Sequence, residues 1–175
     1  MSHNEKRPRD ARASSERVTE KTEYADQPTL SRAALQYSRR GWPVFRLQPN
    51  SKRPTKGSCG FHDATTDPDV IRQWWTQTPT ANIGLAIPPG MIVLDCDLYK
   101  EGAREALADL ERKLGQLPPS PTVRTAGGGL HFYFTCPADA EFAATAAPGI
   151  DIRTGGKHYV VAPPSIIDGV RYEWI

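Results

Sequence analysis

The chain has 175 residues, of which 38% are hydrophobic and 24% charged, and its 22 Lys/Arg and 20 Asp/Glu give a net charge of +2. This length is enough for one domain with a proper core, and the composition is typical of a soluble globular protein. The small net charge argues against a protein that coats nucleic acid by charge alone, while a local basic groove is compatible with it.

The first part of the chain differs from the rest. Residues 1–28 carry six basic and six acidic side chains and almost no large apolar ones. Such a segment cannot bury enough surface to order itself, so we expect a disordered polar tail followed by one domain over residues 29–175. The three cysteines are odd in number and widely spaced, and there is neither a signal peptide nor an apolar run of about 18 residues. These features indicate a reducing cytoplasm and no membrane span, and no zinc site is expected.

Three helices are predicted from caps and apolar stripes, over residues 29–41, 66–75 and about 102–114. Thr29 is the predicted N-cap of the first helix, and Thr66 or Asp67 is the predicted N-cap of the second. Glycines at positions 41 and 115 end the first and third helices. The third helix has one apolar stripe, formed by Ala106, Leu107, Leu110 and Leu114.

Apolar runs and period-two alternation predict the strands. These cover residues 42–47, 82–87, 91–97, 122–125, 130–135, 150–153 and 158–164, with an edge strand at 169–175. The strands 122–125 and 130–135 form a hairpin around Gly127–Gly129. Strands mixed with three helices indicate an α+β fold of two layers. The polar segment 48–60 is a loop with Lys52, Arg53 and Lys56, which suits an ordinary solvated connection or a basic arm for phosphates.

Two aspartates follow the apolar run that begins at Met91. Side chains on a strand alternate, so Asp95 and Asp97 point the same way, with Cα atoms about 6.5 Å apart, and Cys96 points the opposite way. Two carboxylates this close repel each other unless a positive charge lies between them, and a hard divalent cation is the natural guest. A strand end whose aspartates cap the next turn is the alternative, because the pattern is short and common.

Two further strands carry residues of the same chemistry. Asp151 lies between two isoleucines, and His131 follows a glycine run that lets phosphates approach the backbone. A core histidine, a flexible turn and a turn-forming aspartate are the structural alternatives. Taken together, three strand-borne carboxylates with a glycine loop and a histidine fit phosphoryl or nucleotidyl transfer, in which two Mg²⁺ or Mn²⁺ ions lie about 3.5–4 Å apart.

An ordered set of motifs supports this interpretation: GWPVF (41–45), KRP (52–54), DATTD (63–67), WW (74–75), NIG (82–84), LDCD (94–97), GGGLH (127–131), DIR (151–153) and APPS (162–165). The set resembles the N-terminal domain of bifunctional DNA primase/polymerases (prim-pol), in the archaeo-eukaryotic primase superfamily, over roughly residues 29–174. The resemblance implies template-dependent nucleotidyl transfer on a modified RNA-recognition-motif-like core, with a mixed or antiparallel sheet and flanking helices.

The resemblance also implies roles for individual residues. Asp95, Asp97 and Asp151 match the catalytic, metal-binding carboxylates, and His131 matches the histidine that contacts the phosphates of the incoming nucleotide. Thr125, Arg124, Arg153 and Lys52 match nucleotide contacts. The implied template contact is Arg53, to which the composition of the loop adds Lys56.

The implied partners are nucleoside triphosphates, a single-stranded DNA template with its primer, and a helicase or helical accessory domain, since many relatives continue into both. Three other classes share parts of the pattern. A haloacid-dehalogenase-type phosphatase also places Asp-x-Asp after an apolar strand, but its pattern requires a small hydroxyl residue soon after the second Asp, where Leu98 and Tyr99 stand here. A non-catalytic single-strand-binding module leaves the three carboxylates unexplained. A metal-dependent nuclease or phosphohydrolase is the closest chemical alternative, because the same ions can activate water.

Overall fold

The computed structural model describes residues 29–175, so the predicted disordered tail over residues 1–28 lies outside the described residues. The helices of this part are α2 (Leu30–Arg39), α3 (Pro68–Gln77) and α4 (Ala103–Leu114), with a short 3-10 helix, η1 (Gly60–Asp63). All three predicted helices are confirmed. No helix among residues 29–175 is long and apolar enough to cross a membrane.

The described strands form two antiparallel sheets and a short ribbon. The small sheet has the order β1 (Val44–Leu47), β2 (Asn82–Ala86), β8 (Tyr159–Ala162). The large sheet has the order β11 (Glu173–Trp174), β4 (Thr122–Arg124), β5 (Leu130–Thr135), β3 (Met91–Cys96), β7 (Ile150–Thr154), β6 (Thr145–Ala147). The ribbon pairs β9 (Ile166–Ile167) with β10 (Val170–Arg171). The α+β class is therefore confirmed, and the strands divide between two sheets rather than joining one.

Local signals account for the helix ends. The Thr29 hydroxyl accepts a hydrogen bond from the Arg32 N–H at 3.2 Å, which satisfies one free donor at the start of α2. Asp67, rather than Thr66, caps α3. One detail of the apolar stripe on α4 is wrong: Leu114 is 82% exposed, because the apolar cluster beneath the helix extends only as far as Leu110.

The two sheets join where the chain crosses between them twice. Residues 87–90 carry it from β2 to β3, so these consecutive strands lie in different sheets, and residues 155–158 carry it back from β7 to β8. The two crossings are hydrogen-bonded, since the Gly155 N–H donates to the Met91 carbonyl at 3.1 Å and the Gly156 N–H to the Ile87 carbonyl at 2.9 Å. A side chain on Gly155 would collide with the Pro88 carbonyl. The sheets are thus fastened to each other at one end.

A cluster of aromatic side chains also joins the sheets. Trp42 stacks between Tyr37 of α2 and Tyr133 of β5, with ring centroids 6.0 and 5.8 Å away. The Trp174 indole N–H donates to the Tyr37 hydroxyl at 2.9 Å, and that hydroxyl donates to the Pro163 carbonyl at 2.8 Å. These contacts fix the large sheet, the small sheet and α2 relative to one another.

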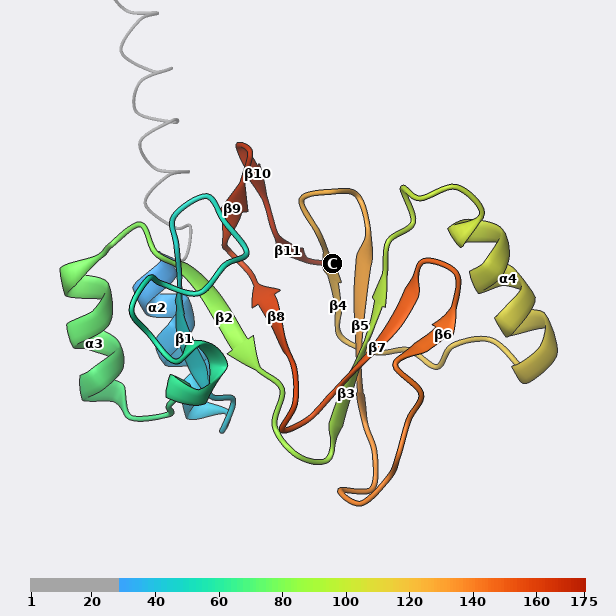
Figure 1. The fold of residues 1–175 in the computed structure, drawn as a ribbon, viewed down its shortest axis with the longest axis horizontal. Helices are drawn as coiled ribbons and strands as arrows, with labels where there is room; N and C mark the ends of the chain where they lie inside the picture. The colour runs from blue at the N-terminus through green and yellow to red at the C-terminus, as the bar shows by residue number, and fades with distance from the viewer. Residues whose placement is uncertain (1–28) are drawn as a thin grey trace, which may run out of the picture.

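Helices cover the outer sides of both sheets. Figure 1 shows α2 and α3 beside the small sheet, and α4 at the opposite end of the molecule beside β6 and β7. The main core lies between α2, α3, the small sheet and one face of the large sheet, which contributes Val93 and Tyr133. The other face of the large sheet packs on α4 through Cys96, Ile150 and Phe132. Both faces of β3 are therefore partly covered.

Two short strands differ from the prediction. The segment 169–175 was expected as one edge strand, but it divides into β10 and β11, and only β11 forms the edge of the large sheet beside β4. The alanine-rich link before Ile150 contains β6, which was not predicted because its residues do not alternate between apolar and polar.

Candidate active site

The centre of the site is one rank of three residues across the large sheet. Asp95 on β3 is the cross-strand partner of His131 on β5 and of Asp151 on β7. Directly opposed residues in antiparallel strands project from the same face, about 5 Å apart. Residues that the chain separates by up to 56 positions are thus assembled by the register of β3 with its two neighbours.

Asp95 is largely buried, with a side chain 19% exposed, and two cationic or polar partners face it. The His131 Nε2 lies 3.4 Å from Asp95 Oδ1, and the Arg153 Nε and Nη2 atoms each donate to Asp95 Oδ2 at 3.3 Å. Burial by itself raises the pKa of Asp95, but the hydrogen bonds and charges of His131 and Arg153 together outweigh it and hold the pKa below its ordinary value. Asp95 is therefore a carboxylate at neutral pH.

Arg153 bridges two of the three predicted carboxylates. Besides its contacts with Asp95, its Nη2 atom donates to Asp151 Oδ2 at 2.8 Å, and the other Asp151 oxygen accepts from the Thr145 hydroxyl at 3.0 Å. Arg153 shares the face of Asp151 because it follows two positions later on β7. The guanidinium thus supplies the positive charge that a close carboxylate pair requires.

Asp97 lies just beyond the end of β3 and has its own cation. Its N–H donates to the Gly149 carbonyl at 2.8 Å, which holds the end of β3 against the start of β7. Its Oδ2 atom forms an ion pair with Lys100 Nζ at 2.7 Å. All three predicted carboxylates are therefore paired with a basic side chain of the same protein.

His131 has a buried nitrogen that nothing in residues 29–175 satisfies. The histidine is 5% exposed, and while its Nε2 faces Asp95, its Nδ1 has no hydrogen-bond partner. The hydroxyl of Tyr133, two positions along the same face of β5, is also buried without a partner. Buried polar atoms of this kind are commonly satisfied by an ordered water.

The glycine loop before His131 packs tightly against the end of β3. A Cβ on Gly129 would lie 2.6 Å from the Cys96 carbonyl oxygen and 3.2 Å from the Thr125 hydroxyl oxygen. That hydroxyl accepts a hydrogen bond from the Gly129 N–H at 3.0 Å, so Thr125 closes the loop. The space that Gly129 leaves is therefore filled by the protein itself, whereas the sequence suggested room for phosphate.

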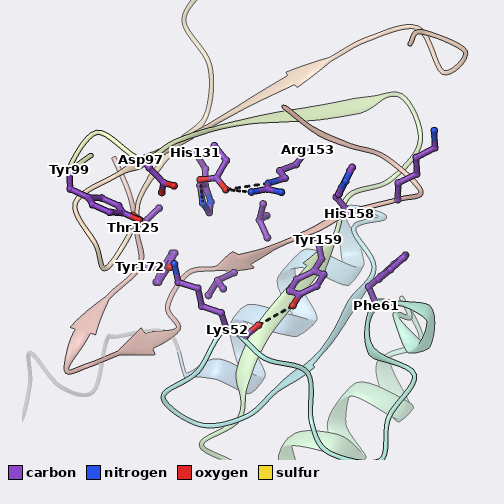
Figure 2. Close-up of a pocket in the computed structure, with 14 residues that line it drawn as sticks. Lys52, Phe61, Asp97, Tyr99, Thr125, His131, Arg153, His158, Tyr159 and Tyr172 are labelled. Carbon is purple, nitrogen blue, oxygen red and sulfur yellow. Dashed lines mark hydrogen bonds and ion pairs between the residues drawn. The ribbon is translucent and has the colours of Figure 1, made fainter. Parts of the chain in front are cut away.

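A cleft of about 390 Å³ opens over the rank of Asp95. Figure 2 shows Asp97, His131 and Arg153 along one wall, with Lys52, Phe61 and Tyr159 across from them. The cleft lies between the two sheets, because β8 contributes Val160 and Val161 to its lining. The full set of lining residues is Lys52, Phe61, Asp95, Asp97, Tyr99, Thr125, His131, Arg153, Lys157, His158, Tyr159, Val160, Val161 and Tyr172.

The structure brings six of the ten predicted site residues into this cleft: Lys52, Asp95, Asp97, Thr125, His131 and Arg153. Asp151 lies beside the cleft and is linked to it through Arg153. The other three predicted residues, Arg53, Lys56 and Arg124, are not in the lining, and Arg124 pairs instead with Glu173 at 3.4 Å on the exposed edge of the large sheet.

Several lining residues were not predicted from the sequence. Lys157, His158 and Tyr159 come from the end of the small sheet and its preceding turn, and only the crossing between the sheets brings them to Asp95. His158 Nδ1 accepts from the Thr154 N–H at 3.0 Å, so this ring is oriented by β7. Lys100 had a local signal, since it follows Asp97 by three positions in a turn, as an ion-pair partner often does.

The three carboxylates are the expected ligands of the divalent ions. No group of three His, Cys, Asp or Glu side chains in residues 29–175 is arranged to hold a metal ion. The donor set nevertheless fits, because carboxylate oxygens are the ligands that Mg²⁺ and Mn²⁺ prefer, and these three oxygens already face nitrogen cations at 2.7 to 3.3 Å. A divalent ion would have to replace Arg153 and Lys100 at those oxygens.

The comparisons with known proteins agree with the geometry. A family model described as "Bifunctional DNA primase/polymerase, N-terminal" (Prim-Pol) matches residues 34–175, which include the cleft and all three carboxylates. None of the curated proteins shows significant similarity to the chain.

Proposed function

The chain belongs to the family of bifunctional DNA primase/polymerase N-terminal domains, and on this premise we propose that it is a template-dependent nucleotidyltransferase that extends or initiates primers on single-stranded DNA. Membership of the family implies DNA and nucleotides as substrates. The observation that carries the finer proposal is the cross-strand alignment of His131, Asp95 and Asp151, of which His131 and Asp95 line a cleft whose opposite wall carries Lys52. An acidic centre faced by a cation suits a substrate that arrives as a metal-bound polyphosphate.

Residues 29–175 would form one catalytic domain on a modified RNA-recognition-motif-like core. Three features support this: β3 lies at the middle of an antiparallel sheet, β5 and β7 flank it, and α4 covers one face. The opposite face would then bind nucleotide and template near Asp95, where the cleft separates the large sheet from the small sheet.

Asp95, Asp97 and Asp151 would hold two Mg²⁺ or Mn²⁺ ions. When bound, such ions stabilise the developing charge on the attacking and leaving oxygens of an in-line phosphoryl transfer. The protein's own contribution is to keep Asp95 ionised inside a largely buried environment, which His131 and Arg153 do by lowering its pKa. The register of β3 with β7 brings the Asp95 and Asp151 carboxylates together.

The basic and polar residues of the cleft would bind the nucleotide. His131, Arg153 and Lys52 are suited to the triphosphate because each offers a nitrogen donor on the cleft wall, and Thr125 orders the loop beside them. Arg124, Arg53 and Lys56 lie outside the lining; Arg53 and Lys56 would contact the template, and Arg124 the distal part of the nucleotide. A helicase or helical accessory domain as partner stays a prediction of the family resemblance alone.

Primer extension tests the proposal. The purified chain is incubated with primed and unprimed single-stranded templates, Mg²⁺ or Mn²⁺, and ribo- or deoxyribonucleotides. We expect extension by the wild type, none by Asp95→Asn or Asp97→Asn, and normal extension by the control Asp109→Asn, an exposed carboxylate on α4 that pairs with Arg112. Metal-dependent cleavage without extension would identify a nuclease. Binding of single strands with neither reaction would identify a non-catalytic module.

A further inference from the structure

The acidic residues of the cleft are neutralised by the protein itself. Arg153 joins Asp95 and Asp151, and Lys100 pairs with Asp97. We propose that Arg153, assisted by Lys100, is an internal counter-ion that closes the metal site of the free protein, and that the triphosphate of an incoming nucleotide opens the site by drawing these side chains away. This inference rests on the proposed function, because it assigns the divalent ions to the same carboxylates.

The geometry of Arg153 makes the competition direct. Its Nη2 atom lies 2.8 Å from Asp151 Oδ2 and 3.3 Å from Asp95 Oδ2, so one guanidinium nitrogen contacts both carboxylates across neighbouring strands. A divalent ion held by Asp95 and Asp151 would need those same oxygens. Two cations cannot share the oxygens at these distances without strong repulsion, so one has to leave when the other binds.

A counter-ion is required in the free protein. Asp95 and Asp151 are directly opposed on antiparallel strands, and Asp97 lies next to them at the end of β3. Without a cation, this cluster would destabilise the fold or take up a proton. Arg153 removes that repulsion before any metal arrives, and it is a better choice than a lysine because its planar fork satisfies two carboxylates at once.

Both basic side chains are able to move. The Arg153 side chain is 34% exposed and lines the cleft, and the Lys100 side chain is 53% exposed and pairs with Asp97 of the lining. A nucleoside triphosphate in the cleft would offer phosphate oxygens to each of them. Phosphate, like carboxylate, forms bidentate hydrogen bonds with a guanidinium. The carboxylates would then be released for the ions. Binding of nucleotide and binding of metal would therefore favour each other, and by linkage the effect is reciprocal.

The test is a titration of the protein with Mn²⁺ in the absence of nucleotide. The electron paramagnetic resonance signal of free Mn²⁺ reports how much of the ion is bound, so the measurement needs no enzymatic activity. Arg153→Gln is expected to bind Mn²⁺ at least tenfold more tightly than the wild type. Lys100→Gln should give a smaller gain, because the exposed Lys100 pair is screened by solvent. Arg153→Lys keeps the positive charge but loses the fork, and it should fall between Arg153→Gln and the wild type. The matched control is Arg72→Gln, which removes an arginine from an exposed pair with Asp69 on α3 and should match the wild type.

Thermal unfolding keeps the test decisive if Arg153→Gln is unstable. Without metal, we expect this variant to have a lower melting temperature than the wild type. On addition of Mn²⁺, its melting temperature should rise by more than that of the wild type. Equal or weaker Mn²⁺ binding by Arg153→Gln overturns the inference. If the wild type still extends primers in that case, the proposed function stands and only the counter-ion role fails. If neither protein binds Mn²⁺ and no primer is extended, both are wrong.

Discussion

Replacing Asp95 by asparagine removes a charge from the centre of the large sheet while it keeps the size of the side chain. The carboxylate accepts two hydrogen bonds from Arg153 at 3.3 Å and faces His131 at 3.4 Å. Hydrogen bonds to charged groups contribute about 1.5–3 kcal/mol, but these are long, and Arg153 keeps Asp151 as a partner. We therefore expect Asp95→Asn to lower the free energy of unfolding by about 1–2 kcal/mol, which corresponds to a melting temperature roughly 2–8 °C lower.

The stability difference should depend on pH in one direction. Burial alone would raise the pKa of Asp95, yet His131 and Arg153 hold it below the ordinary value of 3.8. A carboxyl group whose pKa is lower in the folded protein stabilises the fold fully above its unfolded pKa, and this contribution is lost as the pH falls through the folded pKa. The gap between the wild type and Asp95→Asn should thus be constant above about pH 5 and shrink below about pH 4.

Urea unfolding at pH 7, 5 and 3.5, followed by tryptophan fluorescence, measures this difference. The control is Asp109→Asn, which removes an exposed carboxylate from the middle of α4 and should change the free energy of unfolding by less than about 0.5 kcal/mol. The reasoning would be refuted by an Asp95→Asn variant as stable as the wild type at pH 7. A gap that is as large at pH 3.5 as at pH 7 would refute it as well.

Three further variants test other parts of the site. His131→Ala should weaken nucleotide affinity roughly tenfold to a hundredfold, because a donor to the triphosphate is lost, and leave single-strand binding nearly unchanged; the reverse pattern in equilibrium binding would make it a template residue. Lys52→Ala should weaken nucleotide binding more at low salt than at high salt, whereas Arg53→Ala, outside the cleft lining, should not; equal losses in a salt titration would contradict the assignment. Gly129→Ala should lower the melting temperature measurably, because its Cβ would meet the Cys96 carbonyl at 2.6 Å, and an unchanged melting temperature would show that the loop can shift freely.

Much of the fold could be predicted from the sequence because its signals are local. Thr29 and Asp67 cap their helices through hydrogen bonds that span two or three residues, and the apolar stripes repeat every three or four positions. The two faces of each strand could also be predicted from the sequence. Asp95 and His131 lie on one face of the large sheet, and Cys96 lies on the other, as the alternation of side chains predicts. These features depend only on neighbouring residues.

The hairpin of β4 and β5 was predicted from its glycine turn and is confirmed, but the pairing of strands that are not joined by a short turn could not be predicted in this way. β2 and β3 are consecutive, yet they belong to different sheets, and the short strand β6 has no pattern of its own. Strand pairing depends on contacts between residues far apart in the chain, whose entropy cost and packing a local pattern does not record. The individual strands that hold the carboxylates could therefore be predicted, but their order in the sheet could not.

For the candidate site, the sequence by itself determined the chemistry: two same-face carboxylates after an apolar strand, a third on another strand, and a histidine after a glycine loop. Only the tertiary structure decided that Asp95 stands between His131 and Asp151, and that Arg153 pairs with both of these carboxylates. The physical reason is that residue type and alternation are properties of one strand, while register and charge pairing arise only when several strands meet. The neutralising role of Arg153 is for that reason a property of the assembled sheet.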